Sequence, residues 1–410
     1  MIFRNIKFYL TILFITLSTS FLFAQTANEF YSKGVAAMAS ENYPEALSYF
    51  NKAIEKVPHF YEALYEKGRC NYYLQNYNLA ITDFSEAIKY NPDFVDAFYY
   101  KALSYCAKGE EKKALENYNI VLKMEPEHSQ SLLKRSEIHI KNGKLNDALT
   151  DLSKAIKLSP DNPNMLFIRG GIYQQLGDVE KAIADYSRAV EMDPNHANLR
   201  YNLAVLYLET NEYEKAIENF TIAIENGIEN ADVYSQRAEA FLQSENYLEA
   251  VKDYTTLINT YRQRNEQRYF QRAHAYFLAE EWNAAIKDFT KTIAQNMHNE
   301  DAYIYRAEAY THVGRDSQAM SDYRFVSRIN PDNSMVYERR GIMYLEEGRI
   351  DNALEDLNQA IKLGAGANAY FYRAAIKDMQ NDTKGACEDL YEASELGHEK
   401  AKEKFLEYCR

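Results

Sequence analysis

Apolar residues recur along this chain at spacings of three and four, and no window alternates with a period of two over the length of a strand. The first spacing places apolar side chains on one face of a helix. Gly (15) and Pro (8) are scarce in 410 residues, and no Pro-, Gly- or Ser-rich linker interrupts the chain. We therefore expect an all-α protein with one continuous architecture.

One pattern of small and large residues repeats throughout the chain. An alanine is followed four residues later by an aromatic residue or leucine, as in Ala46 and Phe50. Eight of the ten intervals between these alanines are 34 residues. Twelve residues before each alanine stands another small residue, such as Gly34 or Gly68. Small residues at paired sites let two helices approach closely, and the larger side chain fills the adjoining space.

Proline marks the end of many units. Twelve residues after the alanine, where a helix must stop, stand Pro58, Pro92, Pro126, Pro160, Pro194 and Pro331. In four units this position holds Ile228, Arg262, Met297 or Ala365, and the seventh unit has one extra residue. Each unit is thus predicted to be a helix, a turn, a second helix and a stop.

This period and pattern resemble the tetratricopeptide repeat family. The resemblance covers residues 27–400 and implies an α-solenoid, a right-handed superhelix of about eleven helix-turn-helix repeats with a concave inner face. The repeats are expected to start near residues 27, 61, 95, 129, 163, 197, 231, 266, 300, 334 and 367. A C-terminal capping helix is expected over residues 398–410, because the last unit would otherwise expose apolar surface.

The first 24 residues differ from the rest. Arg4 and Lys7 precede an apolar run over residues 8–17, and Ala24 stands before Gln25. This arrangement predicts a secretory signal peptide over residues 1–24. An uncleaved membrane anchor is the alternative, but the run is short and rich in hydroxyl residues. Export to the periplasm is the first expectation, with outer-membrane association or secretion as alternatives, and no integral membrane segment remains after cleavage.

The charge of the chain bears on its partners. The formal net charge of −13 becomes −15 once the two cations of the signal peptide are removed. An acidic protein repels phosphate groups at long range. We therefore expect no nucleic-acid partner.

A ladder of charges accompanies the repeat. One residue before the small position stands Lys33, Lys67, Lys101, Arg135, Arg169, Arg237, Arg272, Arg306, Arg340 or Arg373, and Leu203 is the exception. Sixteen residues later, eight of the units carry an aspartate, whereas the unit with Leu203 carries the neutral Asn219. We expect Arg–Asp pairs within a unit or between neighbours. An anion-binding role for the arginines is the weaker alternative, because each has a carboxylate available.

Two of the four cysteines are predicted to pair. If the hairpin turns at Gly397 and His398, then Cys387 and Cys409 face each other across it. An exported protein can form a disulfide at such a position. Cys70 and Cys106 lie on first helices of adjacent units, where the spacing is less favourable, and are expected to be free thiols.

The family resemblance places ligands along the inner groove, which the first helix of each unit lines. Carried over to this chain, the groove-facing positions hold Tyr31, Tyr65, Arg69, Tyr72, Tyr99, Leu103, Leu133, Phe167, Tyr201, Leu208, Phe270, His274, Phe277, Ile304 and Phe371. A stripe rich in Tyr and Phe has the composition of a protein or peptide contact. Packing of some of these rings against the next unit is the alternative. The Lys and Asn clamp of chaperone-binding members is not present at these positions.

The sequence contains none of the common catalytic motifs, which disfavours an enzyme. The eight histidines are scattered, and no HExxH, nucleophile elbow, phosphate loop or CxxC occurs. We therefore expect no enzyme, no cofactor and no metal site.

The predicted function is a non-catalytic scaffold that binds protein or peptide partners in a bacterial cell-envelope assembly. Alternatives are a structural subunit of a secretion or outer-membrane biogenesis complex that binds through its convex face and ends, or, remotely, an enzyme with an unrecognised site. By its Phe-Ala-Gln junction and Gly-Ala-Cys-Glu-Asp-Leu ending, the chain resembles exported tetratricopeptide proteins of the Bacteroidota type.

Overall fold

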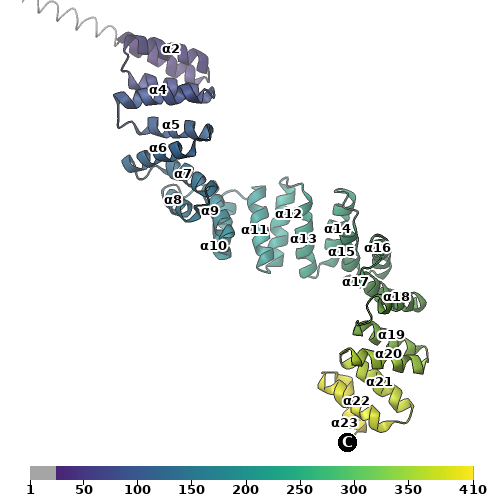
Figure 1. Cartoon of the computed structure of the whole chain (residues 1–410). Coiled ribbons are helices and arrows are strands. Elements are labelled where there is room, and N and C mark those ends of the chain that lie inside the picture. Colours follow the sequence, from purple (N-terminus) through teal and green to yellow (C-terminus); the bar gives the residue numbers. More distant parts are fainter. Residues whose placement is uncertain (1–24, 410) are drawn as a thin grey trace, which may run out of the picture. The chain divides into compact units, whose positions relative to one another are not determined.

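The computed structural model describes residues 25–409, and the predicted signal peptide at residues 1–24 lies outside the described residues. Residues 25–39 are helical, and the helices α2 to α23 follow without any strand in the described part of the chain. Successive helices pair as hairpins (Figure 1). The protein is therefore all-α, as the hydrophobic spacing predicts.

Each hairpin has a first and a second helix. The first helices are residues 25–39, α3 (Tyr61–Tyr73), α5 (Val95–Ala107), α7 (Ser129–Lys141), α9 (Pro163–Gln175), α11 (Ala197–Glu209), α13 (Ala231–Gln243), α15 (Glu266–Leu278), α17 (Glu300–His312), α19 (Ser334–Glu346) and α21 (Ala367–Met379). The second helices are α2 (Tyr43–Lys56), α4 (Tyr77–Tyr90), α6 (Glu111–Met124), α8 (Leu145–Leu158), α10 (Val179–Met192), α12 (Tyr213–Glu225), α14 (Tyr247–Asn259), α16 (Trp282–Gln295), α18 (Asp316–Ile329), α20 (Ile350–Lys362) and α22 (Thr383–Glu395). The closing helix α23 spans Glu399–Tyr408.

The hairpins fall into two compact units. One unit runs through Pro194 and ends with α10, and the other begins at Asn195 and contains α11 to α23. Within each unit, the second helix of a hairpin contacts the first helix of the next one. None of the helices in residues 25–409 combines the length and the apolar character that a membrane crossing requires.

One residue in the left-handed conformation turns each hairpin. Glycine holds this position at Gly109 and Gly143, with φ of 76° and 71°, where it is free of steric cost. Other hairpins place a longer residue there, such as Asn211 with φ of 61°. Glycine also follows two second helices whose stop proline is missing, at Gly227 and Gly364. Equivalent second helices can therefore be followed by a proline or by a glycine in the left-handed conformation.

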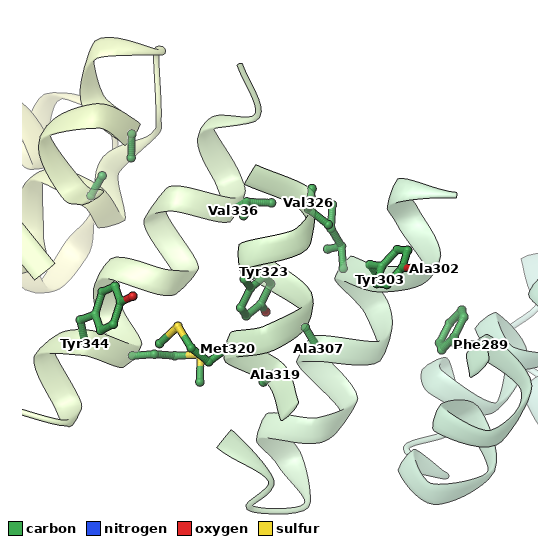
Figure 2. Packing of buried hydrophobic residues seen from close by; sticks show 14 of the residues in the cluster. Phe289, Ala302, Tyr303, Ala307, Ala319, Met320, Tyr323, Val326, Val336 and Tyr344 are labelled. Carbon is green, nitrogen blue, oxygen red and sulfur yellow. The ribbon is translucent and has the colours of Figure 1, made fainter. Parts of the chain in front are cut away.

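The two helices of a hairpin approach closely through the small residues that the sequence pattern singled out. A Cβ atom added at Gly68 would lie 2.7 Å from the Phe84 ring, and one at Gly170 would lie 2.7 Å from the Tyr186 ring. Equivalent rings form the core of each hairpin. Figure 2 shows this core around Tyr323 of α18, which lies among buried residues of α17 and α19. The ring is 2% exposed, so its burial contributes directly to hairpin stability.

The predicted charge ladder forms clamps that join neighbouring hairpins. Arg306 of α17 donates from Nε and Nη2 to the carboxylate of Asp322 on α18, at 2.8 Å each. Its Nη1 donates to Thr290 Oγ1 on the preceding α16, at 3.1 Å. We call this arrangement the arginine clamp. It recurs in full at Arg135, Arg169, Arg237, Arg340 and Arg373. Arg272 donates to Asp288 from Nε alone and to Thr255 on the preceding hairpin, and Lys291 donates to the other oxygen of Asp288. Each clamp thus holds its own hairpin closed and binds the hairpin before it.

Three units lack the aspartate of the ladder, and their residues at the cation position make other contacts. Leu203 replaces the cation, and Asn219 accepts a hydrogen bond from Arg200 at 2.9 Å instead. Lys33 pairs with Glu29 at 2.7 Å on its own helix. Lys101 has no ion pair within residues 25–409, and burial lowers its pKa. Lys67, by contrast, forms the predicted pair with Asp83 at 2.9 Å. The predicted ion pair therefore forms at each of the eight aspartates of the ladder.

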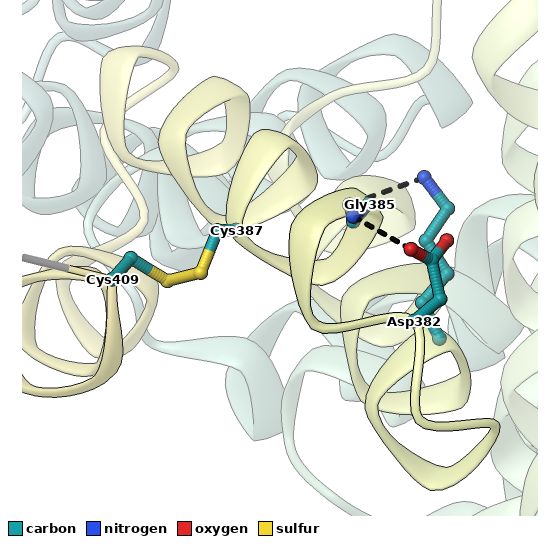
Figure 3. Close-up of a disulfide and its surroundings, with 5 residues drawn as sticks. Asp382, Gly385, Cys387 and Cys409 are labelled. Carbon is teal, nitrogen blue, oxygen red and sulfur yellow. Dashed lines mark hydrogen bonds between the residues drawn. A yellow bond between two sulfur atoms is a disulfide. The ribbon is translucent and has the colours of Figure 1, made fainter.

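A disulfide joins Cys387 of α22 to Cys409 just after α23, with their Cα atoms 5.6 Å apart (Figure 3). At the start of α22, Asp382 caps the helix by accepting a hydrogen bond from the Gly385 N–H at 3.0 Å. The closing helix α23 adds the buried Ala401 to the core of the last hairpin. Cys70 and Cys106 are free thiols, the first buried and the second half-buried.

Candidate partner-binding face

The first-helix face is the surface that the first helices of neighbouring hairpins form within each unit. The predicted groove residues occupy three positions on these helices. The first position holds Tyr31, Tyr65, Tyr99, Leu133, Phe167, Tyr201, Phe270, Ile304 and Phe371, the second holds Arg69, Leu103 and His274, and the third holds Tyr72, Leu208 and Phe277. All of these side chains are buried or half-buried.

The first position packs mainly inside the solenoid. Tyr65 lies 5.9 Å from Phe84 on its own hairpin and 4.7 Å from Phe94 before the next one, measured between ring centroids. Tyr65 and Tyr99 are each 8% exposed, and burial raises the pKa of Tyr99 to about 12. Equivalent ring contacts at about 5.9 Å join Tyr31 to Phe50, Phe167 to Tyr186, Tyr201 to Phe220 and Phe270 to Phe289. Tyr65 and Tyr99 therefore stabilise the stacking of hairpins and leave little surface for a partner.

A cluster of exposed and half-buried rings surrounds Arg69 in the first unit. The guanidinium of Arg69 lies 6.0 Å from the ring centroid of Tyr73 and 5.3 Å from that of Tyr100. Its Nη1 also pairs with Glu66 at 3.0 Å. Tyr72 contacts both rings, at 5.6 Å and 5.8 Å. We call Arg69, Tyr72, Tyr73 and Tyr100 the aromatic patch.

Two members of this patch were missed by sequence reasoning. Tyr73 is 41% exposed, and burial raises the pKa of Tyr100 to about 12. Each directly follows a predicted residue, Tyr72 or Tyr99, in the sequence. The helical period turns neighbouring residues by about 100°, so Tyr73 is exposed whereas Tyr72 is half-buried. Tyr100 is half-buried and also packs against Phe84, with ring centroids 6.0 Å apart.

In the second unit, a hollow of about 480 Å³ opens between α13 and α15. Its lining comprises Glu239, Leu242, Gln243, Glu245, Tyr247, Tyr254, Phe270, Gln271, His274 and Leu278. Only Phe270 and His274 of this lining belong to the predicted groove residues. Burial lowers the pKa of His274, against a smaller opposing effect of the Glu239 charge, so the ring is neutral at pH 7.

A second hollow, of about 350 Å³, lies among α17, α19 and α21. Two of its charged side chains form an ion pair, because Arg339 Nη2 lies 3.4 Å from Glu308 Oε1, and Glu346 also lines it. His312 at its edge stacks on Trp282 with ring centroids 4.0 Å apart. Phe277 packs edge-on against Trp282 at 5.2 Å. Trp282 therefore begins α16 as a packing residue of the hairpin turn.

The last groove residue faces the closing helix. Phe371 stacks on His398 with ring centroids 4.2 Å apart, and Lys404 Nζ lies 5.5 Å from its ring centroid. The side chain is thus engaged by the C-terminal cap.

No group of three or more His, Cys, Asp or Glu side chains in residues 25–409 is arranged to hold a metal ion. His274 instead packs by its ring, whose centroid lies 5.1 Å from that of Tyr305. The site is therefore best described as a surface of rings, hollows and charges.

The stacked hairpins, with small residues facing rings and a first-helix face left open, define a helical-repeat solenoid. Models described as tetratricopeptide repeat match residues 61–94, 96–128 and 201–264, and one described as TPR repeat matches residues 137–177 and 170–211. A model described as ETO1 C-terminal domain matches residues 240–408. The chain is built of tetratricopeptide repeats, which commonly mediate contacts between proteins.

Several solved structures are similar to the chain. A tetratricopeptide repeat protein from Parabacteroides merdae shares 22% identity, with 61% of this chain and 98% of that chain covered and a TM-score of 0.39. The C-terminal part of a TPR repeat-containing protein from Cytophaga hutchinsonii shares 16% identity, covering 66% and 97%, with a TM-score of 0.43. YrrB, described as a TPR protein with an unusual peptide-binding site, shares 19% identity, covering 45% and 95%, with a TM-score of 0.40. The sequence has no significant match among curated proteins.

Proposed function

We propose that this protein is a non-catalytic scaffold that binds protein or peptide partners along its first-helix face. The observation that carries the proposal is the aromatic patch, where Tyr73 is 41% exposed beside the half-buried Arg69 and Tyr72. Tyr and Arg side chains dominate the energetics of protein interfaces. The hollows between first helices in the second unit add sites for individual side chains of a partner.

We further propose that the scaffold acts in a bacterial cell-envelope assembly, in the periplasm or at the outer membrane. Support comes from the signal-like pattern of residues 1–24 and from the paired cysteines, which suit an oxidising compartment. The protein purified from an envelope fraction is expected to begin at Gln25, as read by N-terminal sequencing. An intact Met1 in that fraction would favour the uncleaved anchor.

Removing two rings of the aromatic patch is expected to weaken partner capture. Replacing Tyr72 and Tyr73 by alanine removes two interface rings, and we expect roughly tenfold less partner to be retained from envelope extract, because clustered aromatic residues carry much of an interface's binding energy. Neither residue belongs to the fully buried core. Circular dichroism before capture verifies that the variant folds, and mass spectrometry of the captured material names the partner.

The matched control is Leu79→Ala in the same hairpin. Leu79 lies on the second helix α4 and is 57% exposed, so its loss removes apolar surface outside the first-helix face. Normal capture by this control and loss in the double variant support the proposal. Normal capture by the double variant, with loss in the control, would move binding to the second helices, as in a structural subunit of an envelope complex.

A further inference from the structure

A buried hydroxyl without a partner lies at the hollow between α13 and α15. Tyr254 of α14 lines this hollow and is fully buried. Its hydroxyl has no hydrogen-bond partner among residues 25–409. A buried polar group in this state costs free energy that a bound ligand can recover.

The equivalent tyrosines explain why this hydroxyl is unpartnered. Tyr118 Oη lies 3.7 Å from Cys106 Sγ, and Tyr186 Oη donates to Gln174 Oε1 at 3.3 Å. In both hairpins the partner stands twelve residues earlier, on the first helix. The residue twelve before Tyr254 is Leu242, which has no polar atom in its side chain and also lines the hollow. The substitution therefore removes the partner that the equivalent hydroxyls have, and the unpartnered hydroxyl belongs to a residue that lines the hollow.

The side chains that line the hollow carry a negative net charge. Glu239 and Glu245 are exposed at its rim, and neither takes part in an ion pair in the described part of the chain. Glu239 accepts a hydrogen bond only from the neutral amide of Gln243, at 3.0 Å. No lysine or arginine lines the hollow, and burial lowers the pKa of the half-buried His274. The nearest cation named beside the lining is Arg268, whose Nη1 donates to Gln271 at 2.8 Å. The hollow of α17, α19 and α21 differs, because Arg339 pairs with Glu308 there.

We propose that the hollow between α13 and α15 binds a lysine or arginine side chain of a partner peptide. The apolar stem of that side chain packs against Leu242, Phe270 and Leu278, as long cationic side chains commonly do. Its cationic end donates to Glu239 and to the hydroxyl of Tyr254. The volume of about 480 Å³ lies within the range of small-ligand sites, about 300–1,000 Å³. This inference rests on the proposed function and names the partner chemistry of one site on the same face.

The test uses pools of short fluorescein-labelled peptides with randomised flanks, which differ only in a fixed central residue. The central residue is arginine, lysine, leucine, glutamine or glutamate. Fluorescence polarisation with the purified full chain measures the affinity of each pool. We expect the arginine and lysine pools to bind at least about fivefold more tightly than the leucine, glutamine and glutamate pools. This preference for basic peptides is expected to weaken at high salt.

Two variants locate the preference. Glu239→Gln is expected to weaken the arginine pool by about fivefold, since an exposed charge pair is worth up to about 1 kcal/mol. Tyr254→Phe is expected to weaken it by a similar factor, about fivefold, through the lost hydrogen bond. The phenylalanine variant should fold at least as stably as the wild type, because the removed hydroxyl is unpartnered. Weaker binding without weaker folding is a result that a purely structural role of Tyr254 does not produce.

The controls are Glu218→Gln and Tyr186→Phe. Glu218 is an exposed residue of the second helix α12, and Tyr186 already has a partner in the first unit. Both controls are expected to keep the preference for basic peptides. Equal binding of all pools by the wild type, or an unchanged preference in both Glu239→Gln and Tyr254→Phe, would overturn the inference and leave the proposed function intact. Absence of binding by every pool would overturn it together with peptide binding by the first-helix face.

Discussion

Replacing Arg306 with leucine is expected to destabilise the second unit by roughly 3 kcal/mol, because it leaves the buried carboxylate of Asp322 without its partner. The Arg306 and Asp322 side chains are 13% and 8% exposed, so water compensates the stranded charge poorly. The same change also breaks the hydrogen bond from Arg306 to Thr290 on the preceding hairpin. Urea denaturation followed by circular dichroism measures the loss.

The chain supplies the compensating substitution. Where leucine already stands in the ladder, at Leu203, the position of the aspartate holds the neutral Asn219. Combining Arg306→Leu with Asp322→Asn copies that pair, and we expect it to recover about half of the lost stability, because no buried charge is left unpaired. A double variant as unstable as the single one would show that the contact to the preceding hairpin, and not the stranded charge, dominates the cost.

Removing the disulfide is expected to release the closing helix. Replacing Cys387 and Cys409 by alanine opens a loop of 22 residues, and loops of this size gain about 3 kcal/mol from a cross-link. Helix α23 has ten residues and buries only Ala401 completely. An isolated helix shorter than about 12 residues is marginal in water. We therefore expect hydrogen exchange in residues 399–408 to accelerate strongly, while exchange in α3 to α10 stays unchanged.

Reduction separates this effect from the loss of a thiol. The wild type treated with dithiothreitol should exchange like the double alanine variant, and the variant itself should not respond to the reductant. Cys106→Ala is the matched control, because Cys106 is a free, half-buried thiol. Slow exchange of α23 in the reduced wild type would contradict the prediction and indicate that packing of Phe405 and Ala401 holds the helix.

The repeat and its local consequences were predictable from the sequence because they depend on short spacings. The 34-residue period placed the first helices, which begin at Tyr61, Val95 and the equivalent later positions. The pairing of Gly68 with the Phe84 ring followed from a spacing of sixteen residues within one hairpin. The number of residues on each side of the Gly397 turn predicted that Cys387 and Cys409 face each other, and they form a disulfide.

The candidate site was less predictable because its members lie on different hairpins. The sequence by itself could not tell that Tyr65 is buried against Phe94 while Tyr73 is exposed. Both are aromatic residues of the same helix, and their surroundings come from the next repeat.

The sequence alone thus determined the helices, their order and the contacts inside each hairpin, because these follow from helical periodicity and from separations of fewer than 34 residues. Only the tertiary structure decided how hairpins meet. It showed the arginine clamp reaching from Arg306 to Thr290 on the preceding hairpin. It also showed the Tyr254 hydroxyl without a partner in the hollow between α13 and α15. The contact between Arg306 and Thr290 and the opening of the hollow depend on the distance and angle between neighbouring repeats, which side-chain packing sets and which no spacing within a single repeat encodes.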